Sequence, residues 1–219
     1  MDNFPILTAL ILLPLVGAAW ILLVPGGTEV ARAHNARMTA LLTSLLVFAL
    51  AVVLWLNFDN GNGGFQFIEK HDLFGPYFSY HLGIDGIALV LIALTAFLMP
   101  LCVIASWDSI QTRVCEYMAA FLFMEALMIG VFASLDMMLF YIFFEGGLIP
   151  MYLIIGIWGG KRRIYASFKF FLYTLLGSVL MLLAIMAMYW HAGTTDIPTL
   201  LQTRFPANMQ IWLWLAFFA

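Results

Sequence analysis

Long apolar runs separated by short polar segments dominate the chain. A membrane-spanning helix needs about 20 mostly apolar residues. Six runs satisfy this rule, at residues 4–24, 38–57, 86–106, 117–134, 137–158 and 164–190. A seventh run begins near Met209 and continues to Ala219, which predicts the start of a seventh helix. The pattern therefore predicts an all-α polytopic membrane protein with six complete transmembrane helices and part of a seventh.

The composition agrees with this pattern. The 219 residues are 64% hydrophobic and only 10% charged, with a mean hydropathy of +1.02, far from the values of soluble domains. The net charge is −3 and no basic stripe is present, which excludes nucleic acid as a partner and leaves the lipid bilayer. No basic residue precedes the first apolar run, so we expect a retained helix rather than a cleaved signal peptide.

The basic residues predict the orientation. Most lie after the first, third and fifth expected helices, at Arg32, Arg37, Arg113, Lys161, Arg162 and Arg163. The loops on the opposite side carry only Lys70 and Arg204. By the positive-inside rule the first group is cytoplasmic. We therefore expect a periplasmic N-terminus and an outer loop over residues 58–84.

This outer loop contains a glycine-rich turn, residues 61–64, between polar and aromatic segments. That arrangement predicts a short hairpin on the membrane surface. The spacing of His71 and His81 matches no metal-ligand pattern and favours an aromatic interfacial cap. Asp85 precedes the third apolar run and is expected to cap that helix.

The expected helix 137–158 carries an acid, Glu145, near its middle. An ionised carboxylate at this depth costs from about 3 to more than 10 kcal/mol unless it is paired, hydrated or protonated. Gly146 and Gly147 follow directly, and Pro150 removes a backbone donor one turn later, so the helix is expected to deform easily. These features are typical of a transporter site. The alternative is a protonated acid that bonds a neighbouring helix and locks packing.

A second acid, Glu125, lies ten residues before Leu135, and Glu145 lies ten residues after it. With a turn at 134–136, both carboxyl groups lie roughly 15 Å from the outer surface. If they face each other, charge repulsion and desolvation favour a proton on one of them. Tyr141 and Tyr152 lie near the face of Glu145 and are candidates to anchor a short water chain.

Lys169 is the candidate cation of the sixth expected helix. Tyr165 and Tyr173 are its neighbours at i−4 and i+4. Its axial offset from Glu145 is about 6 Å in a core about 30 Å thick. Glu125, Glu145 and Lys169 together predict a proton relay, because protonating one site alters the next. The alternative for Lys169 is a side chain that snorkels to the headgroups. No metal, haem or phosphate-binding pattern is present in the sequence.

Three segments carry a resemblance to a known family: YHLGIDGIALVLIALTAFL, LFYIFFEGGLIPMYLIIGIWGG and YASFKFFLYTLLGS. They resemble the antiporter-like membrane subunit, chain M or chain 4, of proton-pumping NADH:quinone oxidoreductase, respiratory complex I. The resemblance implies a fourteen-helix fold with two inverted five-helix repeats. Residues 1–219 would then form one membrane domain. Its first part, 1–110, contains three helices and the outer loop, and 114–219 is the truncated first part of the first repeat.

The resemblance also implies roles for individual residues. Glu145 matches the fifth-helix glutamate that pairs with a seventh-helix lysine, and Glu125 matches the fourth-helix glutamate. Lys169 corresponds to a lysine of a KFF motif in related chains. The sequence ends at Ala219, just before the seventh-helix lysine is expected, so the fragment by itself is not expected to pump.

The function implied is that of a proton-translocating subunit of this enzyme, a translocase, coupled to quinone reduction. No cofactor is expected in this chain; NADH, FMN, iron–sulfur clusters and quinone belong to partner subunits. The expected partners are other membrane subunits, including neighbouring antiporter-like chains. The expected location is the bacterial inner membrane, with the mitochondrial inner membrane as the alternative. Alternative functions are a subunit of a multisubunit sodium/proton antiporter, a membrane scaffold, and a quinone-binding role.

Overall fold

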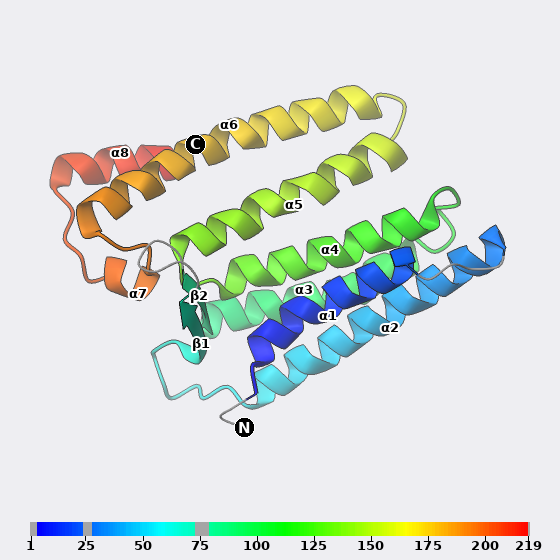
Figure 1. The fold of residues 1–219 in the computed structure, drawn as a ribbon, viewed down its shortest axis with the longest axis horizontal. Coiled ribbons are helices and arrows are strands. Elements are labelled where there is room, and N and C mark those ends of the chain that lie inside the picture. Colours follow the sequence, from blue (N-terminus) through cyan, green and yellow to red (C-terminus); the bar gives the residue numbers. More distant parts are fainter. Residues whose placement is uncertain (1–3, 24–27, 73–78, 219) are drawn as a thin grey trace. The chain divides into compact units, whose positions relative to one another are not determined.

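The computed structural model describes residues 4–23, 28–72 and 79–218 (Figure 1). The chain divides into two compact units. Unit 1 comprises residues 1–67 and 83–133, and unit 2 comprises residues 68–82 and 134–219.

Unit 1 consists of four long helices. They are α1 (Ile6–Leu23), α2 (Glu29–Leu56), α3 (Gly86–Ala105) and α4 (Val114–Ala133). Helix α1 packs against α2 and α4, and α3 packs against the same two helices. Their buried core includes Leu10, Val47, Ile92 and Leu122. Many large apolar side chains on the other faces are exposed, as expected for helices that contact lipid.

Helices α1 and α2 approach closely at Gly17. A Cβ atom built at this position would lie 2.7 Å from Cγ2 and Oγ1 of Thr43 on α2. Contacts under 3 Å are too close for carbon atoms, so any larger residue at Gly17 would displace Thr43 or one helix. Small residues at helix crossings are characteristic of membrane proteins, where packing supplies the association energy.

Helix α2 begins nine residues before the predicted start at Met38. Thr28 caps it, because the Thr28 side chain accepts a hydrogen bond of 3.3 Å from the Ala31 amide. Arg32 and Arg37, which were expected in a loop, therefore lie on the first turns of the helix. Hydropathy detects only the apolar part of a helix, and this polar extension carries no such signal.

Unit 2 contains most of a two-stranded sheet and four helices. Strand β1 (Gln66–Asp72) pairs with β2 (Ser79–Ile84). The helices are α5 (Met137–Trp158), α6 (Arg163–Ala192), α7 (Ile197–Leu200) and α8 (Ala207–Phe218). Helix α5 packs against α6, and α6 also contacts α8. Helix α5 continues through Gly146, Gly147 and Pro150 to its end at Trp158.

The structure confirms that the predicted outer loop forms a hairpin, but the predicted turn is wrong. Gly61 and Gly64 precede β1 instead of joining the strands. Their amides donate to the side chains of Asp59 and Asn62 at 2.8 and 3.0 Å, so the glycines form local turns stabilised by Asp and Asn. Residues 73–78, which connect the two strands, lie outside the described residues.

The six predicted transmembrane helices are confirmed. Helices α1 to α6 are each long and apolar enough to cross a membrane, within the described part of the chain. The α5 bounds coincide with the predicted run 137–158. Asp85 caps α3 as expected, because its carboxylate accepts a hydrogen bond of 2.7 Å from the Ala88 amide. The seventh apolar run begins as α8, a helix of 12 residues.

Candidate functional site

Glu125 lies in the middle of α4 and is completely buried, with 0% exposure. Neither carboxyl oxygen has a hydrogen-bond partner among the described residues. Its i+4 neighbour, Ile129, is apolar and also fully buried, so it supplies no polar partner. An unsatisfied buried polar group costs about 1–3 kcal/mol. An acid retained at that cost is a candidate functional group.

Glu145 lies near the middle of α5 and is half-buried. Its Oε1 is buried and has no hydrogen-bond partner among the described residues. The side chain of Tyr141, one turn earlier, interacts with the side chains of Glu145 and of Ser178 on α6. The predicted proximity of Tyr141 and Glu145 is therefore present. The ring of the second candidate, Tyr152, packs edge-on against Phe168 with a centroid separation of 5.6 Å.

Lys169 is exposed on α6. Its Nζ lies 5.9 Å from the ring centroid of Tyr165, which confirms the predicted i−4 contact. In the described chain Lys169 forms no ion pair, so the structure does not bring it together with Glu145. Glu125 and Glu145 belong to different units, and their predicted face-to-face arrangement stays a prediction. The relay role of all three residues likewise stays a prediction.

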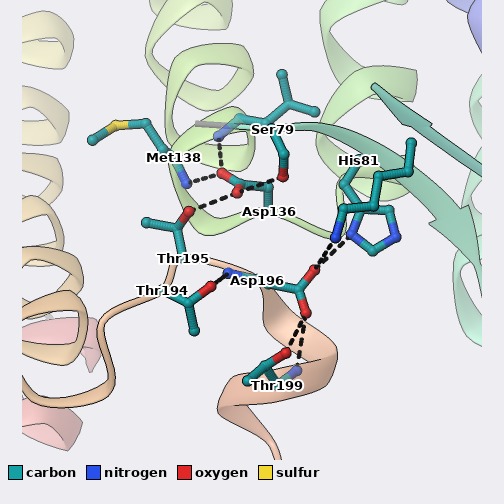
Figure 2. A network of polar contacts seen from close by, with 10 residues as sticks. Ser79, His81, Asp136, Met138, Thr194, Thr195, Asp196 and Thr199 are labelled. Atoms are coloured by element: carbon teal, nitrogen blue, oxygen red, sulfur yellow. Dashed lines mark hydrogen bonds and ion pairs between the residues drawn. The ribbon is translucent and has the colours of Figure 1, made fainter. Parts of the chain in front are cut away.

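A polar cluster that was not predicted from the sequence surrounds Asp136 at the start of α5 (Figure 2). Its Oδ1 accepts hydrogen bonds from the amides of Met138 and Leu139 at 2.9 and 3.1 Å. Its Oδ2 accepts from the hydroxyls of Ser79 and Thr195 at 3.2 and 2.6 Å. Asp136 is 1% exposed, and these four donors satisfy both of its oxygens.

Asp196 forms the second centre of the cluster, at the N-cap of α7. Its Oδ1 lies 2.7 Å from His81 Nδ1 and 3.8 Å from Lys70 Nζ. Its Oδ2 accepts from the amide and the hydroxyl of Thr199 at 3.1 and 2.6 Å. Burial is the largest single influence and raises the pKa of Asp196. The hydrogen bonds from Thr199 and His81 together outweigh it, so the pKa lies below its ordinary value.

Backbone hydrogen bonds hold the same three segments together. The Leu135 amide donates to the His81 carbonyl at 2.8 Å, and the Ile197 amide donates to the Leu135 carbonyl at 2.9 Å. The Met137 amide donates to the Thr195 carbonyl at 2.9 Å. These bonds connect β2, the start of α5 and the segment before α7. The cluster therefore anchors the helix that carries Glu145.

One sequence signal for the cluster was available. Asp136 and Asp196 each directly precede a helix, a position where aspartate commonly caps. The pairing of His81 with Asp196 had no such signal. Across the described residues, no group of three or more histidine, cysteine, aspartate or glutamate side chains is placed to hold a metal ion.

The two family profiles that match the chain meet at Ser134. Residues 18–134 match the family described as NADH-ubiquinone oxidoreductase chain 4, amino terminus. The chain belongs to the NADH-ubiquinone oxidoreductase chain 4 family. Residues 134–219 match the profile described as NADH:quinone oxidoreductase/Mrp antiporter, TM. The resemblance seen in the sequence is thereby confirmed.

Individual relatives in this family are much longer than this chain. It is 50% identical to NADH-quinone oxidoreductase subunit M of Rhodobacter capsulatus, covering 98% of this chain and 44% of that protein. It is 46% identical to NADH-ubiquinone oxidoreductase chain 4 of Arabidopsis thaliana, covering 97% and 43%. A chain in the structure of respiratory complex I from Thermus thermophilus with bound NADH aligns with a TM-score of 0.81 and 28% identity, covering 96% and 42%. The chain thus spans less than half the length of these relatives.

Proposed function

We propose that this chain is the N-terminal part of a subunit that moves protons across the membrane, through Glu125, Glu145 and Lys169. The observation that carries the proposal is the burial of Glu125 without a hydrogen-bond partner among the described residues. A proton site in an apolar helix has to be desolvated and free to exchange its proton. Glu145, with one oxygen buried and unpartnered beside Tyr141, is the second such site.

This arrangement favours a relay over a scaffold. In a scaffold, a buried acid would be retained because it bonds a neighbouring helix. The oxygens of Glu125 accept no hydrogen bond in the described chain, so no packing bond accounts for it. The polar bonds that do connect segments are made elsewhere, by Asp136 and Asp196. In this proposal Asp136 and Asp196 anchor segments of the chain, and Glu125 and Glu145 transfer protons.

The driving reaction belongs to partner subunits in this proposal. The names of the relatives point to an enzyme that oxidises NADH and reduces a quinone. NADH, FMN, iron–sulfur clusters and quinone would be bound by the partners, which include neighbouring antiporter-like chains. We place the complex in the bacterial inner membrane because a bacterial relative is 50% identical, with the mitochondrial inner membrane as the alternative.

The experiment replaces Glu125 and Glu145 singly by Gln in the full-length subunit within its assembled complex. Each change keeps the shape of the side chain and removes its titration. We expect NADH-driven proton uptake by inverted membrane vesicles to fall roughly tenfold or more, as for loss of a proton-transfer group. Asp108→Asn, an exposed acid before α4, is the control and should leave uptake unchanged. Normal uptake in both glutamine variants of an assembled complex would refute the relay.

The second candidate is a subunit of a multisubunit sodium/proton antiporter. It is favoured by the profile over residues 134–219, whose description includes both NADH:quinone oxidoreductases and Mrp antiporters. Affinity purification of the full-length subunit distinguishes the two. Recovery of NADH-oxidising activity supports the first proposal. Sodium-dependent proton exchange without that activity supports the antiporter.

A further inference from the structure

Two adjoining cavities occur at one end of unit 1, and neither is used by the proposed proton path. In Figure 1 the end of α1 and the starts of α2 and α4 lie together at this end. The larger cavity, about 560 Å³, is lined by several charged side chains, and we call it the charged cavity. The smaller one, about 200 Å³, is largely apolar, and we call it the apolar groove. They share two lining residues, Arg32 and Cys115, so they lie next to each other.

The charged cavity contains side chains of both signs. Arg32, Arg37 and Arg113 line it together with Glu29 and Glu116, which gives three positive and two negative charges. Glu29 and Glu116 lie on the first turns of α2 and α4, where the helix dipole stabilises negative charge. A ligand that fits this lining carries a negative group and a positive group close together.

Arg37 lines the charged cavity, and its side chain is held in place by two contacts. Its Nη2 donates a hydrogen bond of 2.8 Å to the Ile110 carbonyl, and its guanidinium carbon lies 5.9 Å from the ring centroid of Trp107. Its Nε is buried and has no hydrogen-bond partner among the described residues. A guanidinium held in this way presents a positive charge to the cavity, which suits an anionic group.

Arg32 and Arg113 are exposed and available to a ligand. Among the described residues neither guanidinium donates a hydrogen bond or enters an ion pair. Arg113 also has a φ of +51°, in the left-handed region that costs a residue other than glycine about 1–2 kcal/mol. Such an outlier beside a cavity is compatible with a binding role.

The apolar groove offers an apolar surface, which a free inorganic anion would not use. Trp20 and Ile21 of α1 and Met38 and Leu42 of α2 line it. The charged cavity adjoins the end of α1, where lipid headgroups are expected if this helix crosses the bilayer. An elongated ligand with a charged head and an apolar tail would occupy both cavities.

We propose that these two cavities bind one phospholipid with a phosphoethanolamine headgroup. Its phosphate contacts the guanidinium groups of Arg32, Arg37 and Arg113, which suit phosphate oxygens. Its primary ammonium contacts the carboxylates of Glu29 and Glu116. One acyl chain follows the apolar groove between α1 and α2. Phosphatidylglycerol lacks the ammonium, and the quaternary ammonium of phosphatidylcholine has no N–H to donate.

The test uses the full-length subunit in its purified complex, reconstituted in phosphatidylcholine nanodiscs. The probe is phosphatidylethanolamine with a photoactivatable group on its acyl chain, and crosslinked peptides are mapped by mass spectrometry. We expect labelling of the peptides that contain Trp20 and Met38. Unlabelled phosphatidylethanolamine should compete, whereas phosphatidylcholine, phosphatidylglycerol and inorganic phosphate should not.

Variants assign the headgroup contacts. Arg32→Gln and Arg113→Gln should each reduce labelling about fivefold, as expected for one arginine beside a lipid headgroup. Glu29→Gln should reduce the preference for phosphatidylethanolamine over phosphatidylglycerol. Lys161→Gln is the matched control, because it removes one exposed cation from the same predicted membrane side, and should label normally. Arg32→Gln alone suffices if a variant at another position fails to assemble.

Three outcomes would overturn the proposal. The first is equal labelling of Arg32→Gln and Lys161→Gln. The second is equal competition by phosphatidylglycerol or phosphatidylcholine, which would remove the ammonium contact. The third is displacement of the probe by inorganic phosphate, which would identify a site for a free anion.

Discussion

The imidazole Nδ1 of His81 lies 2.7 Å from Oδ1 of Asp196, although 115 residues separate them in the chain. His81 belongs to β2 and is 6% exposed, and Asp196 caps α7. The contact therefore connects the hairpin to the segment that follows α6. Through Leu135, whose backbone bonds to both His81 and Ile197, it also reaches the start of α5.

Low pH should weaken this connection, because the carboxylate of Asp196 becomes protonated. The pKa of Asp196 is lowered in the folded protein, so its contribution to stability is present above the unfolded pKa of 3.8 and is lost as the pH falls through the folded value. Wild-type protein should therefore lose more thermal stability between pH ~6 and pH ~3 than Asp196→Asn. Tryptophan fluorescence of the detergent-solubilised, full-length subunit during heating measures this difference.

The control for this prediction is Asp108→Asn, which removes an exposed acid without a role in the cluster. It should retain the acid-dependent loss of wild type. An equal loss in Asp196→Asn and wild type would show that the carboxylate of Asp196 is not stabilised by His81 and Thr199.

Asp136→Ala should destabilise the start of α5. The change removes the cap of α5 and leaves the buried hydroxyls of Ser79 and Thr195 without their acceptor. Loss of a cap costs about 0.5–2 kcal/mol, and a buried unsatisfied donor costs about 1–3 kcal/mol. We expect a total of about 2 kcal/mol or more in the free energy of unfolding, measured with denaturant. Asp136→Asn, which keeps one acceptor oxygen, should lose less; an equal loss would contradict the capping role.

Glu125→Met should raise the thermal stability of the protein and lower its proton uptake. Methionine has a similar volume and removes a buried polar group that has no partner among the described residues, so the thermal midpoint should rise. Proton uptake driven by NADH should fall, because methionine cannot titrate. A lower thermal midpoint would instead indicate that Glu125 makes a stabilising bond, as the scaffold hypothesis requires.

Gly17→Val should separate α1 from α2. The new side chain would meet Thr43, whose Cγ2 and Oγ1 already lie 2.7 Å from the position of a Cβ atom. Overpacking of this kind costs about 1–3 kcal/mol. The same unfolding assay measures the loss. The double variant Gly17→Ala/Thr43→Ala should recover stability relative to Gly17→Ala alone; if it does not, the contact with Thr43 is not what requires glycine.

The bounds of the membrane helices were largely predictable from the sequence. Helix α5 coincides with the apolar run 137–158, and α3 ends one residue before the predicted Ser106. Transfer into lipid depends on the apolar length of each segment, and that length is a local property. The positions of Glu125 and Glu145 within such runs were visible for the same reason. The polar start of α2 lies outside the apolar run, so the predicted first residue of this helix lies nine residues after the observed one.

The sequence by itself therefore determined that the chain crosses a membrane, where its helices lie and which acids they contain. Only the tertiary structure decided that His81 pairs with Asp196 and that Ser79 and Thr195 share Asp136. It also decided that Arg32, Arg37 and Arg113 line one cavity. These groupings join residues from distant segments. Hydrogen bonds and charge contacts act over a few ångströms, so they depend on how the backbone folds and leave no periodic pattern along the chain.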